Sequence, residues 1–347
     1  MKKLKDRVAK MCISLFTILL VFCIGELVSR IIIFKKNQDS FENAINRLQP
    51  IKNGDNVTLG SIIRPNINPK IIYELRPDIN VNYYGTLRIN EQGWRSDGNF
   101  EIKKNGNMVR ILGLGDSYMF GQGCDQNLNA MNFLEGLLNA EFPEKRWEII
   151  NTAVPGYNTV MEVETLKIKG MQYSPDIVII EYIANDLDLP NFIYDFINCL
   201  DMKHSYFFDL LMKHIKLVDK NFKLYKAPFN STRGWGNEAD PSKVPVQYRN
   251  MVGWDAYMKA MSELKTLQEK YGFQVISLIT WRNKKVSALS TQMGFYTINN
   301  HFYDRRNPEV VLADLHPSVK GHQGTAQLLF DFMVQEGIID KYCKDTD

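Results

Sequence analysis

The sequence predicts an α/β protein in which a central parallel sheet is covered by helices on both faces, preceded by an N-terminal transmembrane helix. Two observations carry this prediction. From Val109 onward, short apolar runs alternate with longer segments of helical periodicity, and such alternation is typical of parallel strands joined by crossover helices. Ahead of that region lies an apolar run near the N-terminus that is long enough to cross a bilayer.

Four apolar runs are expected to form strands and four amphipathic segments to form helices. The runs are short and nearly continuous, as strands buried on both faces of a parallel sheet usually are. One region breaks the alternation, an insertion at about 187–250 with aromatic residues such as Trp235, which we expect to form a helical cap over the strand ends. The expected strands are 109–113, 147–151, 176–183 and 274–280, and the expected helices are 128–141, 159–170, 254–271 and 318–335.

The N-terminal apolar run extends from Met11 to Phe34 and is interrupted by Glu26 and Arg30. These two residues are one helical turn apart and can form an ion pair on one face of a helix. Five basic residues precede the run, so the positive-inside rule places the N-terminus in the cytoplasm. We therefore expect residues 1–36 to be a cytoplasmic basic tip and a single-pass anchor in the cell membrane, with the rest of the chain extracytoplasmic. A cleaved signal peptide is the alternative, although no small-residue cleavage site follows the run.

Residues 37–107 are polar and rich in Asn, Pro and Gly, with short apolar runs around Tyr73 and Trp94. This composition predicts a linker and a small β appendage that packs on the main domain. The main domain is expected at 108–340. Asn56 and Asn230 begin glycosylation sequons, which are short patterns that often occur by chance.

Composition excludes several classes of function. The chain has 347 residues and a net charge of only +3, and no basic stripe interleaved with aromatics indicates a nucleic-acid partner. Its five cysteines have no paired spacing, so neither a disulfide framework nor a metal knuckle is predicted. No metal-ligand spacing and no glycine-rich phosphate loop are found, and we expect no metal and no cofactor.

Ser117 is the first candidate for chemistry. It follows the first expected strand in the turn Gly113-Leu114-Gly115-Asp116-Ser117, and α/β proteins place nucleophiles where the chain turns sharply at the carboxyl end of a parallel strand. His316 and Asp314 lie near the other end of the chain. An imidazole can accept the serine proton, and a carboxylate on its other nitrogen can orient it. Ser117, His316 and Asp314 are therefore the candidate catalytic residues.

Four ordered blocks between about Val109 and Ile338 give the chain a resemblance to SGNH or GDSL-type serine hydrolases. The blocks are Gly115-Asp116-Ser117, Val154-Pro155-Gly156-Tyr157-Asn158, Ala184-Asn185-Asp186 and Asp314-Leu315-His316-Pro317. The resemblance implies a flavodoxin-like three-layer α/β/α fold and an activity on ester bonds.

An attacked ester develops an oxyanion, which needs donors already aimed at it. The backbone N–H groups of Ser117 and Gly156 and the side-chain amide of Asn185 are the expected donors. Asp116, Asn158 and Asp186 are expected to shape and support the loops, with Asp116 as a cap or turn residue. The remaining histidines are expected to be structural, His322 among them.

The spacing of the last block departs from the family. The resembled family usually has its aspartate three residues before the histidine, where this chain has Ala313, and Asp314 lies only two before. The two-residue spacing resembles related polysaccharide O-acetylation proteins. Residues two apart on an extended segment do not stack readily, so the carboxylate needs a turn to reach the ring.

The sequence favours a membrane-anchored extracytoplasmic serine esterase that removes O-acyl, chiefly acetyl, groups from a cell-surface carbohydrate by a Ser-His-Asp mechanism through an acyl-enzyme. Its expected partners are this acylated glycan and the membrane. Two alternatives stay open. One is an O-acyltransferase on a cell-envelope polysaccharide, and the other is a catalytically silent glycan-binding module that retains the fold.

Overall fold

The computed structural model describes residues 2–194, 202, 204–212, 224–227 and 239–343. The chain divides into two compact units, Met1–Leu48 with Tyr194–Leu224, and Gln49–Ile193 with Tyr225–Asp347. Asn230 and Trp235 lie outside the described residues.

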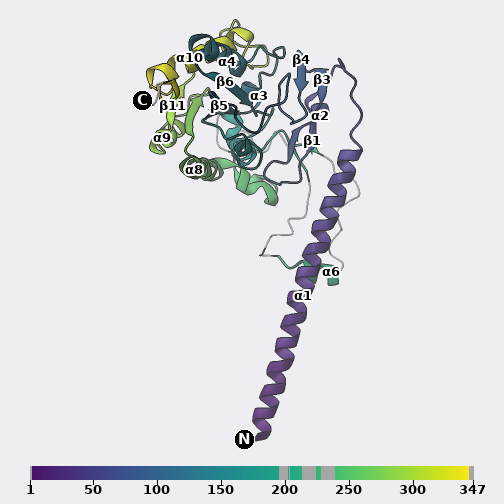
Figure 1. The fold of residues 1–347 in the computed structure, drawn as a ribbon. Helices are drawn as coiled ribbons and strands as arrows, with labels where there is room; N and C mark the ends of the chain where they lie inside the picture. Colours follow the sequence, from purple (N-terminus) through teal and green to yellow (C-terminus); the bar gives the residue numbers. More distant parts are fainter. Residues whose placement is uncertain (1, 195–201, 203, 213–223, 228–238, 344–347) are drawn as a thin grey trace. The chain divides into compact units, whose positions relative to one another are not determined.

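The second unit is built on a five-stranded parallel sheet with the order β11-β10-β7-β5-β6 (Figure 1). β5 pairs directly with β7, although β6 lies between them in the sequence. The winding of the chain therefore reverses between β5 and β7, and in sheets of this order ligands bind at the carboxyl ends beside the reversal. The strands are β5 (Met108–Leu114), β6 (Arg146–Asn151), β7 (Ile177–Tyr182), β10 (Gln274–Ile279) and β11 (Tyr296–Asn299).

The predicted parallel sheet is confirmed, and four of its strands were expected from their apolar runs. Every residue of β5 and β7 is buried, which explains why these runs are continuously apolar. The edge strand β11 was missed because its four residues, Tyr-Thr-Ile-Asn, are half polar and only partly buried.

Helices cover both faces of the sheet, which confirms the three-layer prediction. α4 (Ala130–Glu141) packs against α10 (Val319–Gln335) on one face, and α5 (Thr159–Thr165) packs against α8 (Gly253–Tyr271) on the other. The expected helix 159–170 changes to a π-helical turn at Leu166–Gly170. Two further helices, α9 (Lys284–Gln292) and the short α11 (Asp340–Cys343), complete the C-terminal half.

The expected β appendage is present as two small antiparallel pairs that belong to the same unit as the main sheet. β1 (Ile63–Pro65) follows the short helix α2 (Leu59–Ile62) and pairs with β2 (Tyr73–Leu75), while β3 (Ile79–Asn82) pairs with β4 (Thr86–Ile89). The Tyr73 hydroxyl donates to the Pro155 carbonyl at 3.0 Å. The appendage thus contacts the loop that carries Gly156.

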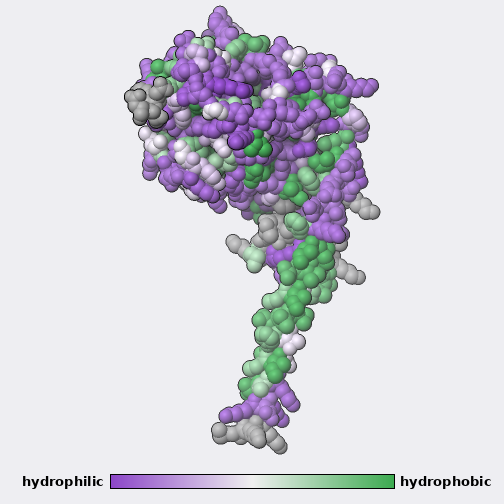
Figure 2. All heavy atoms as spheres, viewed as in Figure 1, coloured by the Kyte–Doolittle hydropathy of each residue, from purple (hydrophilic) through white to green (hydrophobic). Residues whose placement is uncertain are grey.

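The first unit contains α1 (Lys2–Asn46), which is long and apolar enough to cross a membrane by length and composition. Figure 2 shows its apolar side chains gathered along the middle of the helix. The expected pair of Glu26 and Arg30 forms, with 2.7 Å between carboxylate and guanidinium. The helix continues to Asn46, so the linker does not begin at residue 37 as expected.

Residues 195–201, 203, 213–223 and 228–238 of the insertion expected at about 187–250 lie outside the described residues, so the helical cap stays a prediction. The one α-helix in its described part, α6 (Tyr206–Leu211), packs on α1 in the first unit, and there Glu26 accepts hydrogen bonds from the Tyr206 and Phe207 N–H groups. The remaining described elements are two-residue strands and 3-10 turns: β8 (Phe192–Ile193), β9 (Tyr225–Lys226), η4 (Pro241–Lys243) and η5 (Val246–Met251).

Arg95 fastens the appendage to the loop that follows Ser117. Its side chain is buried, and its guanidinium donates to the carbonyls of Phe120, Gly121, Cys124 and Asp125 at 2.8–2.9 Å. Burial lowers the pKa of Arg95 to about 10, so the group stays charged at neutral pH. One cation therefore donates to four backbone carbonyls of the loop, and those of Gly121 and Asp125 also accept from N–H groups of the loop itself.

We predict that Arg95→Met lowers the free energy of unfolding by roughly 3–5 kcal/mol, because several buried carbonyls lose a charged donor. Urea denaturation of the full-length protein in detergent measures the effect. Arg88→Met is the matched control, since Arg88 lies on β4 and is exposed. Equal stability of the two variants would contradict the role given to Arg95.

Candidate active site

The turn after β5 presents Ser117 at the first position of the short helix α3 (Ser117–Phe120). The Asp116 carboxylate caps this turn by accepting from the Tyr118 N–H at 2.9 Å, as expected for a cap residue. A Cβ on Gly115 would lie 2.7 Å from the Met119 Cβ. The small residue is therefore required for the chain to fold back at the end of the strand.

The structure brings Ser117 and His316 together across 199 positions of sequence, with 2.9 Å between Ser117 Oγ and His316 Nε2. On the other side of the ring, Asp314 Oδ2 lies 3.0 Å from Nδ1. The contact does not meet hydrogen-bond geometry, so Nδ1 lies close to the carboxylate without a well-aligned hydrogen bond. Ser117 is buried, whereas 48% of the Asp314 side chain is exposed. The site therefore opens to the surface on the carboxylate side.

A left-handed residue makes the two-residue spacing of Asp314 and His316 workable. Leu315 has φ +71°, a conformation that a non-glycine residue rarely adopts. The turn around it is closed by backbone bonds from the Leu312 N–H to the His316 carbonyl at 2.7 Å and from the Leu315 N–H to the Leu312 carbonyl at 2.9 Å. This is the turn that the spacing demanded.

Two tyrosines hold the strained residue in place. The Leu315 carbonyl lies 2.7 Å from the Tyr118 hydroxyl and 2.8 Å from the Tyr303 hydroxyl. The two hydroxyl oxygens are also 2.7 Å apart. They carry two hydrogens between them, so two of the three contacts are hydrogen bonds at any instant. Trp281 adds a longer contact from Nε1 to the Tyr118 oxygen at 3.4 Å.

The three expected oxyanion donors come from adjacent strand ends. Ser117 follows β5, Gly156 follows β6 and Asn185 follows β7 in the 3-10 turn Ala184–Leu187. The Asn185 amide donates to Asp116 Oδ2 at 2.8 Å, which leaves its second N–H for another acceptor.

Two features of the structure require glycine at position 156, besides room for a substrate. It has φ +79°, and a Cβ there would lie 2.3 Å from the Asn191 amide nitrogen. The Asn191 N–H also donates to the Gly156 carbonyl at 3.1 Å. A side chain at position 156 is therefore excluded both by the backbone angle and by Asn191.

Asn158 and Asp186 form hydrogen bonds between the loops around the candidate site. Asn158 caps α5 and donates to the carbonyls of Asp188 at 2.8 Å and Met251 at 3.0 Å. Asp186 accepts from the Ile183 N–H at 2.6 Å and from the Thr159 hydroxyl at 2.8 Å. The loops after β6 and β7 are thereby joined to each other.

Four buried carboxyl groups lie behind the nucleophile. Burial raises the pKa of Glu181 and of Asp186 to about 8, and the charge of Asp116 adds to both. Burial, followed by the charges of Asp186, Asp116 and Glu181, raises the pKa of Glu162, whose carboxylate oxygens have no partner among the described residues. Burial also raises the pKa of Asp116, opposed by its bonds from Tyr118 and Asn185. At neutral pH Glu181 and Asp186 therefore hold protons.

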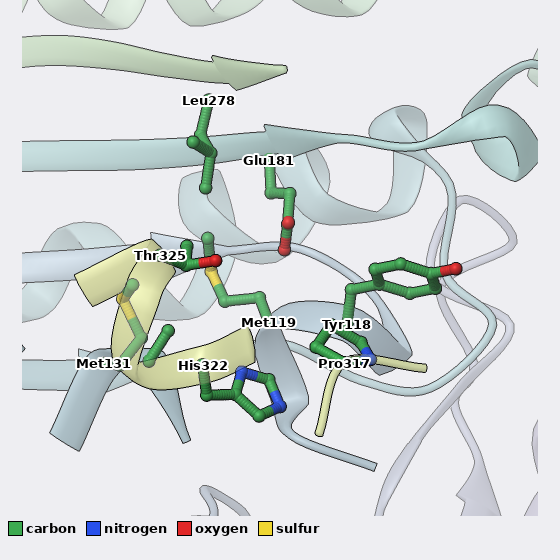
Figure 3. Close-up of a pocket in the computed structure, with 9 residues that line it drawn as sticks. Tyr118, Met119, Met131, Glu181, Leu278, Pro317, His322 and Thr325 are labelled. Carbon is green, nitrogen blue, oxygen red and sulfur yellow. The ribbon is translucent and has the colours of Figure 1, made fainter. Parts of the chain in front are cut away.

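A small internal cavity lies behind Tyr118, with room of about 10 Å³ for the centre of a water molecule. Figure 3 shows Glu181 and His322 among the side chains around it. Burial lowers the pKa of His322 to about 3, with the charges of Arg95 and His316 contributing, so its imidazole is neutral at pH 7. The cavity holds about one water molecule and cannot admit an ester.

Sequence reasoning missed Tyr118, Tyr303, Trp281 and Asn191 as residues of this site. Trp281 directly follows β10, so the carboxyl-edge argument that found Ser117 would also have placed it. Tyr303 follows the missed strand β11 and could not be placed without it. Within the described residues, no cluster of histidine, cysteine and acidic side chains could hold a metal ion.

Comparison of the chain with protein-family models and with curated proteins gives no match. Among solved structures, Axe2, an acetylxylan esterase from Geobacillus stearothermophilus, is 15% identical and aligns over 65% of this chain and 94% of its own, with a TM-score of 0.41. The esterase EstA from Pseudoalteromonas sp. is 15% identical over 67% of this chain and 98% of its own, with a TM-score of 0.39. A putative lipolytic protein of G-D-S-L family from Desulfitobacterium hafniense is 10% identical over 65% of this chain and 99% of its own, with a TM-score of 0.39.

The carboxyl cluster predicts a distinctive dependence of stability on pH. Carboxyl groups with a pKa near 8 in the folded chain and near 4 when unfolded keep protons only in the folded state between these values. The free energy of unfolding should therefore fall as the pH rises from about 4 to about 8.

Glu181→Gln should make the free energy of unfolding less dependent on pH. Relative to the wild type, the variant should therefore be more stable at pH 8 than it is at pH 5. Urea denaturation at both pH values measures the difference. Glu141→Gln, at an exposed position of α4, is the control and should follow the wild type. Parallel curves for wild type and Glu181→Gln would contradict the raised pKa of Glu181.

Proposed function

We propose that this chain is a serine esterase of the SGNH or GDSL type that works through an acyl-enzyme. The observation that carries the proposal is the 2.9 Å contact between Ser117 Oγ and His316 Nε2, with Asp314 3.0 Å from the other ring nitrogen. This distance allows direct proton transfer from the hydroxyl to the imidazole. The four blocks of the resemblance meet at the carboxyl ends of β5, β6 and β7, beside the point where the sheet reverses.

In the first half of the reaction, Ser117 Oγ attacks the carbonyl carbon while His316 Nε2 takes its proton. The negative charge moves to the carbonyl oxygen, and the proposed donors to it are the Ser117 and Gly156 N–H groups and the second N–H of the Asn185 amide. The alcohol then leaves with the proton returned by His316. In the second half, water attacks the acyl-serine by the same route and releases the carboxylic acid. Asp314 stabilises the imidazolium in both halves.

The proposed substrate is a short O-acyl group, chiefly acetyl, on a cell-surface carbohydrate. The exposed side of Asp314 opens the site to the surface, where a polymer can lie across it. We further propose that α1 is an uncleaved anchor and that the second unit is extracytoplasmic, on the basis of its apolar length and the basic residues before it.

Transfer of the acyl group to a sugar hydroxyl is the second candidate, and one observation favours it. Asp314 reaches His316 from two residues away, the spacing that resembles polysaccharide O-acetylation proteins. Hydrolysis and transfer share the acyl-enzyme and differ only in the acceptor. Analysis of products with an acetyl donor and a polysaccharide acceptor separates them, since transfer yields acetylated polymer and hydrolysis yields free acetate.

The test of the proposal is hydrolysis of p-nitrophenyl acetate by the full-length protein in detergent, together with labelling by a fluorophosphonate. Ser117→Ala should lower the rate by at least about 1,000-fold and abolish the label, because the attacking oxygen is lost. Ser262→Ala, at an exposed position of α8, is the matched control and should behave as the wild type.

Two outcomes would overturn the proposal. Ser117→Ala hydrolysing the ester at the wild-type rate would show that another group does the chemistry. A folded wild-type protein that takes no label and has no activity would favour the catalytically silent glycan-binding module.

A further inference from the structure

Two loops beside the candidate active site carry a concentration of positive charge. They are residues 281–285, which follow β10, and residues 303–306, which follow β11; we call them the basic loops. Arg282, Lys284, Lys285, Arg305 and Arg306 are all exposed there, with Asp304 as the one carboxylate. Their combined charge exceeds the net charge of +3 of the whole chain.

The basic loops lie side by side because β10 and β11 are parallel neighbours. The register pairs Ile279 with Asn299 at the carboxyl ends, and the Asn300 N–H donates to the Ile279 carbonyl at 2.9 Å. The Arg305 guanidinium lies 4.3 Å from the centre of the Trp281 ring. Charges that are separated in the sequence therefore face one surface.

The aromatic residues of the basic loops connect this surface to the reacting groups. Trp281 stacks on Tyr303 with 6.4 Å between ring centres. Both contact the Tyr118 hydroxyl, and the Tyr118 ring lies 5.3 Å from that of His316. A substrate bound at Ser117 that extends past His316 along this row reaches the basic loops.

Little within the described residues neutralises this charge. Arg306 contacts Asp304 at 3.4 Å, while Arg282, Lys284, Lys285 and Arg305 form no ion pair among the described residues. Lys284 and Lys285 also lie in the first turn of α9, where the helix dipole is positive and acidic residues are the stabilising choice. The surface thus carries a repulsion that a bound anion would relieve.

We propose that the basic loops bind the anionic groups of the substrate, so that the glycan from which the acyl group is removed is an acidic polysaccharide. This inference rests on the proposed esterase function and names its substrate class. Carboxylate or phosphate groups along the polymer would pair with Arg282 and Arg305, while the ester lies at Ser117. Guanidinium groups suit this task because their planar donors match both kinds of anion.

The experiment measures binding of the full-length protein, in a neutral detergent, to polygalacturonate and to neutral xylan by affinity electrophoresis. The wild type should bind polygalacturonate more tightly than xylan, and raising NaCl from about 0.05 M to about 0.5 M should weaken this binding. The loop variant, Arg282→Glu with Arg305→Glu, should bind polygalacturonate about tenfold more weakly. The single variant Arg305→Gln, a milder change at an exposed position, should lose about threefold.

The matched control is Lys259→Glu with Lys270→Glu, which changes the net charge equally at exposed positions of α8. It should bind polygalacturonate as the wild type does. Equal losses in the loop variant and the control would overturn the proposal, because attraction would then follow overall charge. Equal binding of polygalacturonate and xylan would also overturn it, as would binding to phosphatidylglycerol vesicles in place of the glycan.

Binding does not require the Ser117 hydroxyl, so this test is independent of the proposed reaction. If the protein has no esterase activity but binds polygalacturonate through the basic loops, this inference holds and the proposed function fails. If the protein is an active esterase but does not bind polygalacturonate, the proposed function holds and this inference fails. Where both hold, polygalacturonate should inhibit hydrolysis of p-nitrophenyl acetate by the wild type.

Discussion

The candidate site depends on one strained residue. Leu315 occupies the left-handed region at φ +71°. This bend allows the Asp314 carboxylate to reach the imidazole of His316, although the two residues are only two positions apart. Such a conformation costs of order 1–3 kcal/mol, and it persists here because Tyr118 and Tyr303 both bond to the Leu315 carbonyl. Tyr118 is also the neighbour of Ser117. The hydroxyl that contacts the Leu315 carbonyl therefore belongs to the residue directly after the candidate nucleophile.

The topology of the sheet supplies the remaining alignment. Because β5 lies between β6 and β7, the turns that carry Ser117, Gly156 and Asn185 meet at one edge. The polar groups behind that edge are buried, and the chain keeps them there in two ways. Arg95 satisfies backbone carbonyls as a cation, whereas Glu181 and Asp186 hold protons that solvent would remove. Stability and the geometry of the site are thus linked through buried ionisable groups, one charged and two neutral.

Much of this arrangement could be predicted from the sequence, and the exceptions have physical causes. Long apolar runs identified β5 and β7 because burial on both faces demands them, and the motif blocks found Ser117 and His316. β11 was missed because an edge strand needs little apolar surface. Tyr303 was missed because it acts on a backbone carbonyl, and a sequence pattern does not show which carbonyl a side chain reaches.

The central claim is that the left-handed turn at Leu315 sets the reactivity of Ser117, and the rate of labelling by a fluorophosphonate tests it most directly. Leu315→Gly and Leu315→Val are compared with the wild type in full-length protein, with melting temperatures confirming that each is folded. Glycine adopts a positive φ freely, so this variant should react within about threefold of the wild type. A β-branched residue is a genuine outlier there, and valine should slow the reaction by about 100-fold through misplacement of His316. A folded Leu315→Val protein that is labelled at the wild-type rate would contradict the account.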